Sequence, residues 1–239
     1  SATYEYAKRW TPFLQDHGVK IVTVRPSRTL DYSRAAGSSV QSVQIPAFTL
    51  GLPGERSIPI YDDDDETIGH QTIMSQGGER GVLMRQCTQR WKIAPMRRWL
   101  QANRNGAPVE MWLGISADEI ERQKPSDVQY ITNRFPLLEK KLTVADCEKY
   151  LRDHGIEVPV KSSCVFCPFH NRAAWRELRQ NGNGDWQKAV DVDEAIRDAR
   201  PGFTLFVHPD RKPLAQVGDS IDAQPELMPS DECAGACFL

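Results

Sequence analysis

The chain has 239 residues, of which 40% are hydrophobic and 26% are charged, the composition of an ordinary globular protein. Thirty Lys and Arg residues against 32 Asp and Glu residues give a net charge of −2, which argues against binding nucleic acid mainly through an overall positive field. No run of about 18 apolar residues occurs, so neither a membrane span nor a membrane partner is expected. The opening SATYEYAKRW lacks the apolar stretch of a signal peptide.

The N-terminal quarter of the chain predicts one helix, one strand and a long irregular segment. Residues 2–15 repeat aromatic residues at helical spacing, and 20–25 is a β-branched run typical of a strand. Residues 26–85 are rich in Gly, Ser and Pro and are expected to form a loop-rich insertion or lid over an active site. The acidic run 62–66 is interpreted as a solvated turn in preference to a divalent-cation site.

The remainder of the chain predicts further helices and strands. Helices are expected at 88–101, 143–154, 171–180 and 185–200, a strand at 110–115, and an apolar run at 203–207. Ser116 and Glu119 have the spacing of a capping box, Thr143 is a second helix cap, and Gly155 is a helix stop. The alternation predicts an α/β domain over residues 1–214, followed by a loop-like tail, 215–239.

Six cysteines without an export signal indicate a reducing, cytoplasmic setting, where clustered thiols more often bind metals or exchange electrons than form structural disulfides. Cys164 and Cys167 form a CxxC pair, which can be half of a zinc site, half of an iron–sulfur site or a redox dithiol. Cys87 is the natural candidate for a further ligand. Cys147 lies within a predicted helix and is interpreted as a small buried hydrophobic residue.

The segment around Cys87 resembles a motif of a known family. RQCTQRWKIAPM is similar to the Cys-Cys-x-x-Arg-Lys-Val-x-Pro-Leu motif of assimilatory adenylylsulfate reductases, with Cys87, Lys92 and Pro95 in register. Thr88 replaces the second cysteine, and Trp91 replaces the Arg.

Further segments extend this resemblance towards the C-terminus. WLGISADEIER (112–122) resembles the family's Gly-x-Arg-x-x-Glu-Ser-x-x-Arg segment, and 135–137 resembles its Tyr-Pro-Leu. Residues 143–156 resemble the next helix and its His-Gly exit, and 232–235 resembles the C-terminal Glu-Cys-Gly. The chain therefore resembles the phosphoadenylylsulfate (PAPS) reductase-like branch of the PP-loop, or adenine nucleotide α-hydrolase-like, superfamily.

The resemblance implies a three-layer fold with a mostly parallel sheet flanked by helices. It implies a [4Fe–4S] cluster on Cys87, Cys164 and Cys167, with zinc as the alternative metal. It also implies ATP or a sulfonucleotide as ligand, with a catalytic tail thiol. The implied nucleotide-binding residues are Lys92, Asp118, Glu119 and Arg122, and the implied catalytic residues are Cys233 and Cys237.

Two features depart from the family pattern. The family's phosphate loop, of the Ser-Gly-Gly-x-x-Ser type, is absent, and since the chain starts at Ser1 we expect a truncated N-terminus. Only three of the four cluster cysteines match, which leaves one iron open or bound by another group such as Cys147, Cys233 or Cys237.

These features leave three functions in competition. The first is a PAPS reductase-like enzyme of sulfur metabolism, using a thiol reductant such as thioredoxin. The second is ATP-dependent sulfur transfer to tRNA or DNA, for which the basic and aromatic residues between Arg85 and Trp99 provide a candidate nucleic-acid surface. The third is a non-catalytic, zinc-binding subunit of a modification or defence complex. A homo-oligomer is compatible with each of them.

Overall fold

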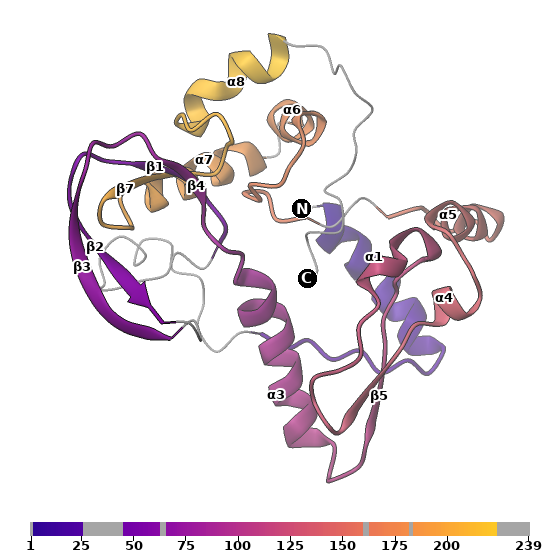
Figure 1. Ribbon diagram of the computed structural model, residues 1–239. Coiled ribbons are helices and arrows are strands. Elements are labelled where there is room, and N and C mark those ends of the chain that lie inside the picture. Colours follow the sequence, from indigo (N-terminus) through magenta and orange to yellow (C-terminus); the bar gives the residue numbers. More distant parts are fainter. Residues whose placement is uncertain (1, 26–44, 63–65, 160–162, 182–183, 224–239) are drawn as a thin grey trace. The chain divides into compact units, whose positions relative to one another are not determined.

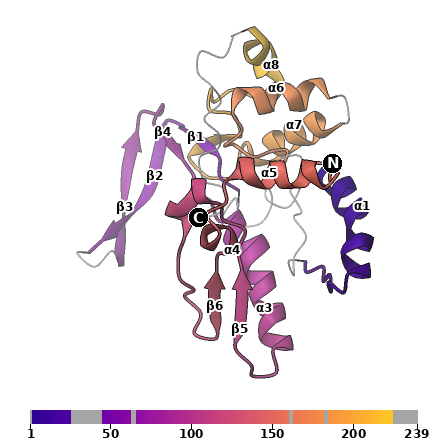
Figure 2. The same cartoon turned by 90° about the vertical axis from the view of Figure 1, so that its right-hand side faces the viewer.

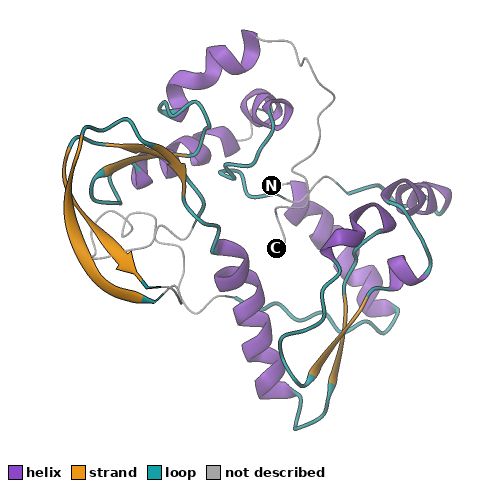
Figure 3. Cartoon of the chain, in the orientation of Figure 1, coloured by secondary structure: helices purple, strands orange, loops and turns teal. Residues whose placement is uncertain are grey.

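The structure is a computed structural model that describes residues 2–25, 45–62, 66–159, 163–181 and 184–223. These residues form helices joined by loops and three small sheets, coloured by type in Figure 3. Within the described ranges, no helix is both long enough and apolar enough to cross a membrane.

The described residues divide into two compact units. Unit 1 contains residues 2–25, 88–159 and 163, and unit 2 contains residues 45–62, 66–87, 164–181 and 184–223. The chain passes from unit 2 to unit 1 directly after Cys87 and returns directly before Cys164. Each unit is therefore made from segments that are distant in sequence.

Unit 1 consists of short helices around one pair of strands (Figure 1). Its elements are α1 (Ala2–Asp16), the π-helical turn η1 (Thr88–Ile93), α3 (Ala94–Asn103), β5 (Val109–Trp112), the 3₁₀ helix η2 (Ala117–Arg122), β6 (Ile131–Arg134), α4 (Pro136–Glu139) and α5 (Val144–Asp153).

Strands β5 and β6 of unit 1 are parallel, with Val109 opposite Ile131 and Trp112 opposite Arg134. Parallel neighbours need a crossover connection, and residues 113–130, including η2, provide it. Both strands therefore end at the same edge, where the Leu113 amide donates to the Arg134 carbonyl at 2.9 Å.

Unit 2 combines antiparallel strands with three helices. Its elements are β1 (Phe48–Gly51), β2 (Gly54–Tyr61), β3 (Thr67–Ser75), β4 (Arg80–Val82), α6 (Arg172–Gln180), α7 (Asp185–Ile196), β7 (Phe203–Phe206) and α8 (Leu214–Ala223). Strands β4, β1 and β7 form one antiparallel sheet, and β2 and β3 form a long two-stranded ribbon (Figure 1).

The three helices of unit 2 lie side by side (Figure 2). Their buried side chains contribute to a hydrophobic core. Trp175 of α6 is 1% exposed, and side chains of α7, β7 and α8 surround the same interior. Asp193 of α7 is fully buried in this core. It accepts hydrogen bonds from the Val207 amide (2.8 Å) and the Leu214 amide (2.9 Å), and it pairs with Arg197.

Most of the predicted helices and strands are present. Helix α1, the η1–α3 pair, α5, α6, α7, β5 and β7 all occupy their predicted segments, with ends shifted by a few residues. Thr143 caps α5 through a complete capping box with Asp146, and Gly155 follows with the positive φ of +66° that suits a glycine after a helix. The second predicted box is not formed, because the side chain of Ser116 makes no cap hydrogen bond.

Three predicted segments were wrong. Residues 20–25 form no strand, because no described segment pairs with them, and Ile21, Val22 and Val24 are exposed. Of the predicted lid, 26–85, residues 26–44 and 63–65 lie outside the described residues, and the rest contains the four strands β1 to β4, with positive-φ glycines, Gly54 and Gly77, where the chain passes from one strand to the next. The start of the tail forms helix α8, because its apolar residues Leu214, Val217 and Ile221 have helical spacing and are buried.

The α/β class is confirmed, whereas the three-layer, mostly parallel sheet is not. The described residues form three separate small sheets, of which only the β5–β6 pair is parallel. The predicted boundary at residue 214 also differs from the division into two units.

Candidate functional site

The predicted nucleotide-binding residues all lie in unit 1. Lys92 is exposed in η1, directly before α3. Asp118, Glu119 and Arg122 lie in η2, which begins shortly after the carboxyl end of β5. In parallel α/β sheets the loops after the carboxyl ends of the strands are the usual place for ligands. Three of the four residues are thus positioned at the end of the strand pair where a ligand is expected.

Polar contacts within unit 1 fix the side chains of Asp118, Glu119 and Arg122. Asp118 accepts a hydrogen bond from the Val144 amide at 2.6 Å, so its carboxylate connects η2 to the first turn of α5. Glu119 and Arg122 form an ion pair one helical turn apart. The Arg122 side chain is only 11% exposed, so this cation is fixed in place and largely desolvated.

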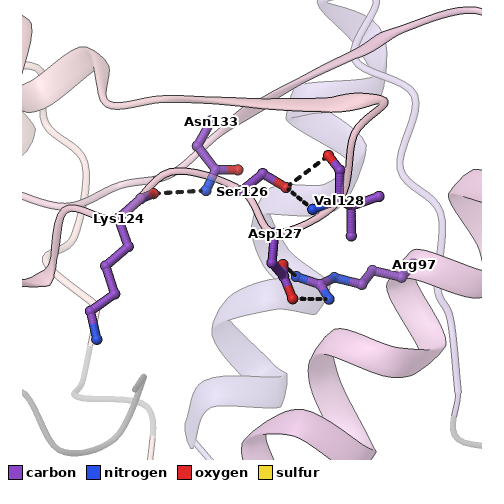
Figure 4. Close-up of polar contacts among 6 residues, drawn as sticks. All are labelled: Arg97, Lys124, Ser126, Asp127, Val128 and Asn133. Carbon is purple, nitrogen blue, oxygen red and sulfur yellow. Dashed lines mark hydrogen bonds and ion pairs between the residues drawn. The ribbon is translucent and has the colours of Figure 1, made fainter.

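The loop between η2 and β6 is tied down by several polar contacts (Figure 4). Arg97 of α3 makes a two-pronged ion pair with Asp127, and this bond holds the pKa of the Asp127 carboxyl below its usual value. The Asn133 side chain donates to the Lys124 carbonyl at 3.0 Å, and Ser126 closes a local turn with Val128. The crossover that positions η2 is thereby anchored on α3 and β6.

A group of residues that sequence reasoning missed occupies one face of the β5–β6 pair. Trp112 is 68% exposed, and its indole Nε1 donates to Glu110, two residues earlier on the same face. Arg134, opposite Trp112 on β6, bonds Glu110 at 3.2 Å and Glu139 at 2.7 and 2.8 Å. The alternation of Glu110 and Trp112 in the sequence was the available signal for a shared face.

The CxxC segment of unit 2 forms a tight turn. The Cys167 amide donates to the Cys164 carbonyl at 3.0 Å, and the His170 amide donates to the Cys167 carbonyl at 3.1 Å. His170 Nε2 also lies 2.8 Å from the Cys164 carbonyl oxygen, so Nε2 is the donor. The imidazole of His170 meets the buried Trp175 edge-on, with ring centroids 4.8 Å apart. His170 thus joins the turn to the hydrophobic core.

Cys87 belongs to the same unit as the CxxC turn, although 77 residues (164 − 87) separate it from Cys164. Arg85, two residues before Cys87, places its guanidinium 5.8 Å from the ring centroid of Phe169, two residues after Cys167. This cation–π contact joins the two cysteine-bearing segments.

The fit of a metal to these thiols is partial. Cys164 is exposed, Cys87 and Cys167 are half-buried, and all three are thiols rather than disulfide partners. Thiolates on one turn suit both zinc and iron. Within the part of the chain that the structure describes, however, no group of three or more His, Cys, Asp or Glu is gathered to hold a metal ion. The turn provides the thiols of Cys164 and Cys167. The third thiol, that of Cys87, lies in the same unit but does not complete a group of three.

The remaining candidate residues have different outcomes. Cys233 and Cys237 lie outside the described residues. Cys147 is half-buried in α5, so it is not the fully buried residue that the sequence predicted. His208, which sequence analysis did not single out, is buried in unit 2 beside Trp175, and burial lowers the pKa of its imidazole.

No family model, no curated protein and no solved structure matches the chain. The resemblance to PAPS reductase-like proteins therefore stays a prediction from the quoted motifs.

Proposed function

We propose that this protein is a PAPS reductase-like enzyme of sulfur metabolism that acts on an adenylated or sulfonucleotide substrate. The observation that carries the proposal is the meeting of two distant segments in unit 2. The contact of Arg85 with Phe169 joins the Cys87 segment to the Cys164–Cys167 turn, as a shared cluster would require. The finer fold assignment, a PP-loop sheet, is part of this proposal, and the parallel β5–β6 pair supports it.

In this proposal, residues of unit 1 bind the substrate, and cysteines of unit 2 hold the cluster. In unit 1, Lys92 and Arg122 provide cations for a phosphate or sulfate, and the anchored crossover holds η2 at the strand ends. In unit 2, Cys87, Cys164 and Cys167 would hold an iron–sulfur cluster, with zinc as the alternative. A bound cluster would supply a sulfur-rich, redox-active centre.

The reductive step is assigned to the tail thiols. The Cys233 thiolate attacks the substrate's sulfonate sulfur, the S–O bond to phosphate breaks, and the nucleotide leaves with the electron pair. Cys237 then attacks the Cys233 sulfur, so sulfite departs and a disulfide forms. A thiol reductant such as thioredoxin returns the disulfide to two thiols, which balances the two electrons.

The test is anaerobic purification of the full chain with analysis of iron, zinc and acid-labile sulfide. We expect about four irons and four sulfides per chain. Both should be lost in Cys164→Ala and Cys167→Ala. His154→Ala, an exposed position at the end of α5, is the control and should keep the full metal content, whereas a loss of iron in Cys147→Ala would identify Cys147 as the fourth ligand. One zinc without sulfide would contradict the cluster and support a structural zinc site.

Sulfonucleotide reduction by the same preparation then separates the enzyme classes. Cys233→Ser should abolish sulfite release if the tail thiol is the nucleophile. Sulfur transfer to tRNA or DNA that survives Cys233→Ser, with no sulfite formed by the wild type, would replace reduction with thiolation.

A further inference from the structure

The exposed face of the β5–β6 pair carries a tryptophan that packing does not explain. Trp112 is 68% exposed, whereas Trp175 in unit 2 is 1% exposed. Large aromatic side chains contribute to folding through burial, so an indole left in solvent contributes little to the stability of its own unit. Its place at the last residue of β5 puts it near the start of η2, which carries three of the predicted nucleotide-binding residues.

The indole of Trp112 is nevertheless held in one orientation. Its Nε1 donates to Glu110, and Glu110 in turn accepts from Arg134, which pairs with Glu139 as well. The hydrogen bond from Trp112, the largest cause, and the charge of Arg134 hold the pKa of the Glu110 carboxyl below its usual value. A flat aromatic surface is thus fixed beside an ionised carboxylate, which keeps lone pairs available for further donors.

The composition of this face favours a polar, planar ligand over a packed helix. Faces of parallel sheets that helices cover are continuously apolar, whereas here Glu110, Thr132 and Arg134 surround one tryptophan. Glu110, Glu139 and Arg134 together carry one net negative charge, which disfavours a polyanionic backbone on the face. A neutral ring that donates hydrogen bonds is complementary to it.

We propose that Trp112 is the platform on which the adenine base of the substrate stacks, and that Glu110 accepts a hydrogen bond from the exocyclic amino group. Stacking uses the free indole face, and the carboxylate distinguishes an amino group from a keto oxygen. This inference rests on the proposed function for its nucleotide, and it names two residues that the motif resemblance does not include.

The experiment measures binding of AMP and IMP to the full chain by calorimetry. The two nucleotides differ in the group at position 6, an amine in AMP and a keto oxygen in IMP. We expect Trp112→Ala to weaken AMP binding about ten-fold or more, and Trp112→Phe to restore most of it. Glu110→Gln should bring the affinities for AMP and IMP towards equality. Tyr150→Ala, which removes a 60%-exposed aromatic of α5, is the matched control and should leave binding unchanged.

Tryptophan fluorescence gives a second readout that does not depend on affinity. AMP should change the emission of the wild type but not that of Trp112→Phe, although Trp112→Phe still binds. Unchanged AMP affinity in Trp112→Ala, with AMP still bound, would overturn this inference and leave the proposed function intact. Absence of AMP binding in the wild type would overturn both.

Discussion

The two units of the molecule bury their residues very differently. Unit 2 has a hydrophobic core around Trp175, with a buried aspartate at its centre. In unit 1, the buried apolar side chains among the described residues are Pro95, Ile131 and Phe135, and ion pairs and caps hold the loops in place. Unit 2 therefore owes its stability mainly to packing, while unit 1 leaves polar and aromatic groups free to meet a ligand.

This difference in burial fits the proposed division between metal binding in unit 2 and nucleotide binding in unit 1. The thiols of the CxxC turn are joined to the packed unit through His170 and Trp175, so that ligands are held on a rigid base. The nucleotide-binding candidates lie on the open unit, where charge rather than packing fixes them. Substitutions in the core of unit 2 should accordingly have the largest effect on folding, and substitutions of the candidate residues of unit 1 should mainly affect nucleotide binding.

The largest effect is expected from Asp193→Ala. The substitution leaves two buried amides, of Val207 and Leu214, and the Arg197 guanidinium without their acceptor, which costs about 3–5 kcal/mol of unfolding free energy. Chemical denaturation monitored by fluorescence measures it. Asp191→Ala, an exposed position on the same helix, should change the unfolding free energy by less than about 0.5 kcal/mol. A loss below about 1 kcal/mol for Asp193→Ala would mean that the carboxylate does not organise the core.

The next largest effect is expected on metal binding by the CxxC turn, which His170 supports. His170→Ala removes the bond to the Cys164 carbonyl and the contact with Trp175, and should weaken binding of Co²⁺, used as a spectroscopic probe of thiolate ligation, about ten-fold. Titration of the reduced apoprotein measures this affinity. His154→Ala, on α5 of unit 1, should bind Co²⁺ as the wild type does. Equal affinities in the two variants would show that the core does not support the turn.

A smaller effect is expected in unit 1. Thr143→Ala removes the capping box of α5 and should cost about 1 kcal/mol. Hydrogen exchange at the first amides of α5 should rise in this variant, while exchange in α7 should not. Equal protection of α5 in the variant and the wild type would indicate that packing, not the cap, holds this helix.

The smallest effect is a pH dependence from His208. Burial is the main cause that lowers the pKa of its imidazole in the folded state. The charge of Arg172 also lowers this pKa, whereas the charges of Asp210 and Asp193 raise it. The unfolded chain then binds more protons, so the stabilisation is present above pH 6.5 and is lost as the pH falls below it. His208→Gln should flatten this part of the pH profile of the unfolding free energy, and an unchanged slope would contradict it.

The sequence predicted elements whose signals are local. Thr143, Asp146 and Gly155 specify both ends of α5 by hydrogen bonds and backbone conformation within a few residues, and the prediction holds. The strand at 20–25 failed because a strand needs a partner, which its own residues do not reveal. The pairing of β1 with β4 and β7 depends on segments up to 158 residues apart (206 − 48), for which composition carries no signal.

The candidate site was likewise predictable only where its residues lie close together in sequence. The family resemblance implied Asp118, Glu119 and Arg122 as candidates, and these residues lie together in η2, after β5. It missed Trp112 and Glu110, because the exposure of the Trp112 indole can be seen only in the structure. The position of His170 just after the CxxC sequence suggested a place beside the thiols, but its contact with Trp175 arises from the packing of α6 and could not be predicted.

The central proposal, that Cys87 and the CxxC turn together hold a cluster in a sulfonucleotide enzyme, is tested most directly by the metal and sulfide content of the anaerobically purified chain. The account predicts about four irons and four sulfides, with a broad visible absorbance that Cys87→Ala and Cys164→Ala each abolish. A chain that contains neither iron nor sulfide, or a cluster that persists in Cys87→Ala, would contradict it.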